Sequence, residues 1–182
     1  IVTVSRLSAT DIATDFGVMP AVLQVIPNGV DTALFRPLPE VARQSNQIIA
    51  TASADAPLKG LSTLLHAVGK LTQKRPELRL VLIARPKPGG DTERVIDALG
   101  LAERIQFVGG ATHEEINQLY AESAAAVVPS LYEGFGLPAV EAMSAGIPVI
   151  SSDGGALAEV VGEGGLLVPA GDSEALAAGL QR

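Results

Sequence analysis

Short apolar runs alternate with segments whose apolar residues recur at helical spacing along most of the chain. The runs are rich in Ile, Val, Leu and Ala, which is typical of buried strands. They predict strands at residues 48–52, 78–84, 105–108, 124–128, 149–151 and 166–168. The segments between and after them predict helices at residues 61–71, 92–99, 113–122, 137–145 and 157–161, and a last one from residue 172.

Strands that are separated by helices cannot pair as hairpins and instead need right-handed crossover connections. The alternation therefore predicts an α/β fold with a Rossmann-like, doubly wound parallel sheet. Such sheets bind ligands at the carboxyl ends of their strands. The loops that follow the predicted strands are rich in glycine and charged residues, whereas the helices are rich in Ala and Leu. We therefore expect the functional site at one edge of the sheet.

The first 40 residues follow a different pattern. A β-branched run at residues 1–5 precedes a predicted helix at residues 8–16, and residues 22–26 predict a further strand. Two prolines interrupt residues 36–39, which indicates a linker. Asn28 and Gly29 form a turn signal, and a structural role is favoured over a catalytic one.

Composition excludes several classes of function. The 182 residues suffice for one domain with a good core, and the formal net charge of −7 argues against a nucleic-acid partner. The chain has no cysteine, which excludes disulfides and thiolate chemistry, and no apolar run reaches the length of a membrane span. It does not start with Met and it stops within a helical pattern, so we expect a piece of a longer polypeptide.

The strongest candidate for chemistry lies between the strand at 124–128 and the helix that follows. This loop reads Glu133-Gly134-Phe135-Gly136-Leu137-Pro138, and a second carboxylate, Glu141, follows about one turn into the helix. Glycines allow a ligand to approach the backbone closely, and Pro is favourable in the first turn of a helix. The unpaired N–H groups that begin a helix form an anion site.

From Pro129 to Ser152 the chain resembles the nucleotide-sugar-binding domain of the family 4 retaining glycosyltransferases, which have the GT-B fold. The signature of that family is two Glu separated by seven residues, which Glu133 and Glu141 match. Further landmarks occur in the expected order: Pro27-Asn28-Gly29-Val30-Asp31, Lys59-Gly60 and Gly165-Leu166-Leu167-Val168-Pro169. The resemblance covers nearly the whole chain.

The resemblance implies the C-terminal half of a GT-B enzyme. Residues 1–20 would be the end of the N-terminal domain or a connecting strand and helix, and residues 21–182 the nucleotide-sugar (donor) binding domain. The implied reaction transfers a sugar from a nucleoside diphosphate sugar to an acceptor hydroxyl with retention of configuration. The acceptor would bind the N-terminal domain, which is missing from this chain. The implied location is the cytoplasm, where the missing domain could make the protein peripheral at the membrane.

The resemblance also assigns roles to the two glutamates. Glu133 would face the donor sugar and its departing phosphate, and Glu141 would accept hydrogen bonds from the two ribose hydroxyls. Each has a simpler alternative. Glu133 could be a carboxylate that stabilises the dipole of the following helix, and Glu141 could be a solvated helix residue.

Lys59 would place a positive charge where the diphosphate develops negative charge, and would therefore act with Glu133 in catalysis. The backbone N–H groups from Gly134 to Leu137 would bind sugar or phosphate oxygens. Lys59 could instead be an ordinary exposed lysine, and the Phe135 side chain could only pack beneath the loop.

The family usually has a Gly-Arg pair about five residues before this lysine, and Ser53 and Ala54 stand there instead. We propose that Arg85 or Lys87, which end the neighbouring strand, supplies the missing positive charge. The alternative is that both are merely solvated. Val108 and Gly109, with Phe107 and Gly110, line the base pocket or form a plain turn: the sequence leaves both open.

No metal site and no cofactor other than the donor nucleotide sugar are expected. The chain has no Asp-x-Asp, and His66 and His113 are isolated from each other and from metal-ligand spacing. Departing diphosphate would act as the base for the acceptor hydroxyl. Alternatives are a nucleotide-sugar epimerase or phosphorylase of the same fold, and a non-catalytic nucleotide-binding or scaffold domain. A dehydrogenase is disfavoured because no Gly-x-Gly-x-x-Gly follows the first strand.

Overall fold

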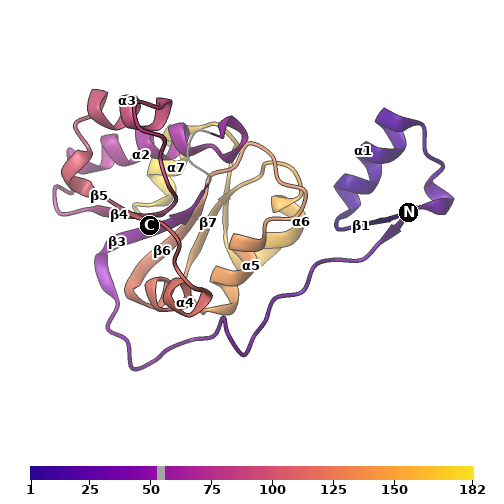
Figure 1. Cartoon of the computed structure of the whole chain (residues 1–182), viewed down its shortest axis with the longest axis horizontal. Helices are drawn as coiled ribbons and strands as arrows, with labels where there is room; N and C mark the ends of the chain where they lie inside the picture. The colour runs from indigo at the N-terminus through magenta and orange to yellow at the C-terminus, as the bar shows by residue number, and fades with distance from the viewer. Residues whose placement is uncertain (53–55) are drawn as a thin grey trace.

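The computed structural model describes residues 1–52 and 56–182. Its main part is a six-stranded, all-parallel sheet with the order β5-β4-β3-β6-β7-β8 (Figure 1). The strands are β3 (Gln44–Thr51), β4 (Arg79–Ile83), β5 (Ile105–Val108), β6 (Ser123–Val128), β7 (Val149–Ser152) and β8 (Leu166–Val168). The chain winds outward in both directions from β3 and β6, which confirms the predicted doubly wound α/β fold and puts the switch point between these two strands.

Helices cover both faces of the sheet. They are α2 (Leu61–Thr72), α3 (Asp91–Ala98), α4 (His113–Glu122), α5 (Leu137–Ser144), α6 (Leu157–Val161) and α7 (Ser173–Gly179), with short 3-10 turns at Pro57–Lys59, Ala102–Arg104 and Gly162–Gly164. One core cluster joins α2, α3 and α7 to one face, and a second joins α4 and α5 to the other. Within the described residues, no helix combines the length and the apolar character that a membrane crossing needs.

The predicted stripe of apolar residues explains how α2 docks. Its five members are all buried: Leu61, Leu64, Leu65, Val68 and Leu71. Burying one such side chain contributes about 1.5–3 kcal/mol, so this face alone is a substantial part of the core. Along β3, Ile48 and Ala50 pack on the α2 side and Ile49 on the opposite side, as the two-residue period of a strand requires.

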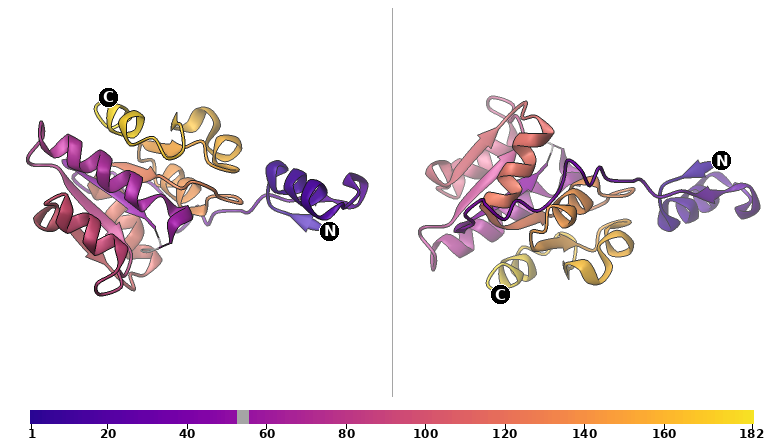
Figure 2. Two further views of the ribbon diagram at one scale, coloured as in Figure 1. Left: turned by 90° about the horizontal axis from the view of Figure 1, so that it is seen from above. Right: turned by 90° about the horizontal axis from the view of Figure 1, so that it is seen from below.

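The N-terminal residues form a small unit set apart from the sheet. It consists of β1 (Val2–Thr3), α1 (Arg6–Phe16), a 3-10 turn at Pro20–Val22 and β2 (Gln24–Val25), with β1 parallel to β2. An extended connection leads from it to β3, and both views in Figure 2 show the unit at one end of the molecule. The strand pairing places Gln24 and Val25 with the N-terminal unit. The division between residues 20 and 21 stays a prediction.

Candidate active site

Two loops meet at the switch point of the sheet. The loop after β3 ends in the turn Pro57–Lys59, and the loop after β6 begins at Pro129. The Leu131 N–H donates to the Leu58 carbonyl at 2.8 Å. Gly60 has a φ of +63°, and a Cβ placed there would lie only 1.9 Å from the Pro129 carbonyl oxygen. Only glycine therefore allows the two backbones to approach this closely.

This contact brings Lys59 and Glu133 together. The Lys59 Nζ lies 2.8 Å from Glu133 Oε1, and the Ser130 hydroxyl donates to the same oxygen at 2.8 Å. The Glu133 side chain is only 14% exposed, so water screens the pair less than on an open surface. A carboxylate can accept about four hydrogen bonds, and two on one oxygen leave Glu133 able to bind a ligand.

Ser130 is a site residue that sequence reasoning missed. Its side chain is buried, and the signal that could have revealed it is its position three residues before Glu133 in the same loop. The main chain of Glu133 is held from the other side, since its carbonyl accepts from the Ala156 N–H at 2.8 Å. Glu133 is thus fixed at both its side chain and its backbone.

The loop ends at Gly136, which precedes the first residue of α5. Gly136 has a φ of +100°, and a Cβ there would lie 2.5 Å from Leu157 Cδ2. Pro138 lies in the first turn, as expected, and no side chain caps the helix. The N–H groups that begin α5 are therefore not covered by a capping side chain. They follow Glu133 in the same loop.

Glu141 lies one turn into α5 and is half-buried. Burial raises the pKa of its carboxyl, because the charged form loses solvation, and the nearby His113 opposes this by lowering that pKa. Tyr120 of α4 is also close. Its hydroxyl donates to the Pro138 carbonyl at 3.4 Å and lies 3.4 Å from the Thr51 hydroxyl, and burial raises its pKa.

His113 was not selected from the sequence, yet the structure places it beside a candidate ligand-binding carboxylate. Its ring lies 5.8 Å from that of Phe35, which in turn lies 6.3 Å from that of Tyr120. His113 and Tyr120 are seven residues apart and so share one face of α4. From this face the Tyr120 hydroxyl reaches the Pro138 carbonyl of α5, and His113 is near enough to act on the pKa of Glu141. The sequence showed only the seven-residue spacing of His113 and Tyr120. It did not show that α5 is the helix near them.

The candidates after β4 and β5 form a separate group. A Cβ on Gly109 would lie 2.6 Å from Arg85 Cγ, and one on Gly110 only 2.4 Å from Arg85 Nη2, so the arginine lies across this turn. The Ala84 N–H donates to the Val108 carbonyl at 3.1 Å. In the sheet, β4 lies between β5 and β3, the strand whose loop leads to Lys59.

The Arg85 side chain thus lies over the turn that follows β5. Lys87 lies further out, in the exposed turn that precedes α3. Ser53 and Ala54, which stand where the family has its Gly-Arg pair, lie outside the described residues. Which cation takes the place of that arginine stays a prediction.

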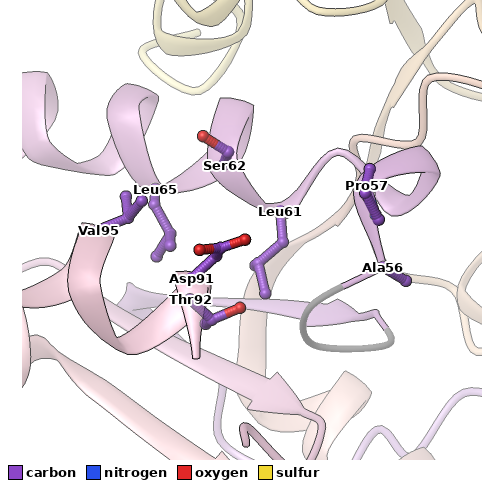
Figure 3. Close-up of a pocket in the computed structure, with 8 residues that line it drawn as sticks. All are labelled: Ala56, Pro57, Leu61, Ser62, Leu65, Asp91, Thr92 and Val95. Atoms are coloured by element: carbon purple, nitrogen blue, oxygen red, sulfur yellow. The ribbon is translucent and has the colours of Figure 1, made fainter. Parts of the chain in front are cut away.

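A cavity of about 270 Å³ lies close by, between α2 and α3 (Figure 3). Its walls are mostly apolar, and its polar lining comes from Ser62, Asp91 and Thr92. Neither Glu133 nor Glu141 lines it. An apolar cavity with a carboxylate in its lining does not suit a diphosphate, so we place the candidate site at the loops after β3 and β6. Among the described residues, no group of three or more His, Cys, Asp or Glu could hold a metal ion.

Comparison with protein families identifies residues 45–182 as a match to the model described as glycosyl transferases group 1. The MMP alpha-(1->4)-mannosyltransferase of Mycolicibacterium hassiacum is 49% identical over 186 residues, covering 100% of this chain and 44% of that protein. The D-inositol 3-phosphate glycosyltransferase of Kribbella flavida is 31% identical over 88% of this chain and 42% of that protein. The chain thus spans less than half the length of these relatives.

Solved structures show the same arrangement. The Anabaena Alr3699/HepE structure in complex with UDP has a TM-score of 0.83 and 29% identity, covering 99% of this chain and 52% of that chain. The sucrose-phosphate synthase of Thermosynechococcus elongatus also has a TM-score of 0.83, with 31% identity over 100% of this chain and 48% of that chain. In both, the likeness extends over the N-terminal unit as well as the sheet.

Proposed function

The chain belongs to the group 1 glycosyl transferases, and we propose that it is the donor-binding part of an enzyme that transfers a sugar from a nucleoside diphosphate to an acceptor hydroxyl. The observation that carries the proposal is the Lys59–Glu133 pair at the switch point, 2.8 Å apart and next to the start of α5. A cation, a carboxylate and helix N–H groups at one place suit a phosphorylated sugar.

Lys59 and the N–H groups that begin α5 provide the electrostatic part of the mechanism. As the bond between the anomeric carbon and the phosphate oxygen breaks, negative charge develops on the diphosphate, and the Lys59 ammonium stabilises it. Glu133 holds this lysine in place before the donor binds and orients the sugar afterwards. The acceptor oxygen then bonds to the anomeric carbon on the same face, and its proton passes to the departing phosphate. Configuration is retained.

Glu141 binds the ribose. A carboxylate accepts hydrogen bonds from a vicinal diol, and its place one turn into α5 sets it apart from the diphosphate-binding N–H groups. The base then extends toward Val108, Gly109 and Arg85 at the ends of β4 and β5. The donor sugar is a hexose: relatives are named as mannosyl and glycosyl transferases, and HepE structures hold UDP with glucose.

Nucleotide binding by the chain tests this proposal. We expect one of uridine, guanosine or adenosine diphosphate to bind the chain. At about 100 times its Kd the ligand adds roughly 2.7 kcal/mol of stability. For a chain of this size that raises Tm by roughly 5–10 °C in a thermal-shift assay. Glu141→Ala should abolish the shift, while Glu163→Gln, an exposed carboxylate in the turn after α6, should preserve it.

Absence of binding by all three nucleotides would favour the scaffold alternative over the transferase. Transfer itself should require the full-length protein, since we assign the acceptor to the other domain. Product analysis with that protein separates transfer from epimerisation and phosphorolysis: only transfer yields a new glycoside and a free nucleoside diphosphate.

Nucleotide affinity is expected to fall in mild acid. The ribose needs the ionised Glu141, and burial raises the pKa of this carboxyl, so protonation weakens binding at a higher pH than it would for an exposed glutamate. His113 lowers the same pKa, and His113→Gln should therefore move the fall in affinity to still higher pH. Titration calorimetry between about pH 4.5 and pH 8 measures both midpoints.

The other histidine supplies the control. His66 lies on α2, where its ring Nδ1 is 2.8 Å from the Ser62 carbonyl, and His66→Gln should leave the midpoint unchanged. A His113→Gln protein whose midpoint equals that of the wild type would show that His113 does not act on Glu141.

A further inference from the structure

Helix α1 of the N-terminal unit reaches the loop that carries Glu133. The Ser8 hydroxyl donates to the Gly134 carbonyl at 3.3 Å, and the Tyr132 hydroxyl donates to the Asp11 carboxylate. Ser8 and Asp11 are three residues apart and so lie on one face of α1. This face contacts the residues on both sides of Glu133, more than 120 positions away in the sequence.

A second contact joins α1 to α6. The Glu159 carboxylate accepts from the Arg6 backbone N–H at 3.0 and 3.3 Å, so it satisfies one of the N–H groups that begin α1. The segment that leads into α6 is also attached to the loop, since the Ala156 N–H donates to the Glu133 carbonyl. The N-terminal unit therefore touches two elements that hold Glu133.

The Ser8 hydroxyl is itself held in place. The buried Ser5 hydroxyl donates to Ser8 Oγ at 2.9 Å, and Ser5 Oγ accepts from the Ser8 N–H at 3.1 Å as the N-cap of α1. With one donor already on its oxygen, Ser8 directs its own proton to the Gly134 carbonyl. The orientation of this bond follows from the capping geometry of the helix.

The Gly134 carbonyl and the Phe135 N–H belong to one planar peptide group and point in opposite directions. A bond that fixes the carbonyl on the α1 side therefore turns the Phe135 N–H away from α1. Glycine lacks the Cβ that limits backbone rotation, so this peptide needs an external contact to hold its direction. Ser8 supplies that contact.

From this geometry we propose that Ser8 and Asp11 are positioning residues for the donor sugar. They act through Gly134 and Tyr132, and docking of α1 gives the Glu133 carboxylate and the Phe135 N–H the direction in which they bind sugar hydroxyls. The inference rests on the proposed function. If docking of α1 favours sugar binding, sugar binding should favour docking of α1 to the same extent.

The test compares the affinity for a nucleoside diphosphate with that for its sugar, using the UDP and UDP-glucose pair and the GDP and GDP-mannose pair. In the wild-type chain the sugar should strengthen binding. Ser8→Ala removes the bond to the Gly134 carbonyl, and Tyr132→Phe removes the bond to Asp11. Either variant also removes the bond between Ser8 and Tyr132. Each should weaken binding of the nucleotide sugar about fivefold while the affinity for the nucleoside diphosphate stays the same.

Thr10→Ala is the matched control, because the Thr10 hydroxyl bonds the Arg6 carbonyl within α1. It should leave both affinities unchanged. If Ser8→Ala and Tyr132→Phe weakened the binding of the nucleoside diphosphate and of the nucleotide sugar equally, the two residues would have a merely structural role and the inference would be wrong. Unchanged affinities for both ligands would also overturn it. A wild-type chain that binds no nucleotide would instead overturn the proposed function itself, and the inference with it.

Discussion

Lys59→Ala is expected to lower the rate of sugar transfer by the full-length protein about 10²–10³-fold, the usual loss when one preorganised charge-stabilising group is removed. The Lys59 ammonium lies 2.8 Å from Glu133 at the switch point, where the diphosphate would depart. Its loss removes charge stabilisation that water cannot replace in the same geometry. The turnover number and the nucleotide affinity should be measured together, because stabilisation confined to the transition state appears mainly in turnover.

Two further variants make the result decisive. Lys74→Ala removes an exposed lysine just after α2 and should retain full activity. Arg85→Ala tests whether a second cation contributes: unchanged affinity and turnover, beside a strong loss for Lys59→Ala, would show that Arg85 does not replace the missing arginine. Transfer by Lys59→Ala at nearly the wild-type rate would contradict the role given to this lysine.

Gly60→Ala is expected to destabilise the fold more than a change to alanine at any other glycine with a similar φ. An alanine Cβ would lie 1.9 Å from the Pro129 carbonyl oxygen, so the loops after β3 and β6 must separate. Such overpacking costs about 1–3 kcal/mol beyond the strain of a positive φ. Tm should fall, and nucleotide affinity should fall with it, since Lys59 and Glu133 depend on this contact.

Gly100 provides the comparison for Gly60. Its φ is +65°, against +63° for Gly60, but nothing lies within 4 Å of the position that a Cβ would take. Gly100→Ala therefore incurs the same backbone strain without the clash. A Tm for Gly60→Ala about 2–12 °C below that of Gly100→Ala is expected. Equal melting temperatures would show that the two loops are not in the close contact described.

Sequence reasoning predicted the parts of the candidate site that depend on local rules and on topology. The glycines around Phe135, the proline in the first turn and the spacing from Glu133 to Glu141 are visible in one short stretch. Parallel topology then places every loop after a strand at one edge, so Lys59 and Glu133 could be assigned to the same site although 74 positions separate them.

Residues whose role comes from packing were not recoverable in this way. His113 acts on the pKa of Glu141 only because folding brings α4 near α5, and the role of Ser130 follows only from the bond of its hydroxyl to Glu133. The sequence placed Arg85 at the carboxyl ends of the strands, where it lies. The position of its side chain across Gly109 depends on a rotamer that no sequence pattern specifies. Each of these contacts depends on side-chain direction as well as chain order.

The amino-acid sequence by itself determined the parallel α/β sheet, because hydrophobic period, glycine turns and crossover handedness are consequences of local chemistry. It also pointed to the edge of the sheet and the charged residues that we propose as the site. The tertiary structure decided which groups hold those residues: Ser130 on Glu133, His113 beside Glu141, and Ser8 on Gly134. Such pairs join distant segments, and their geometry exists only once the helices and loops have packed.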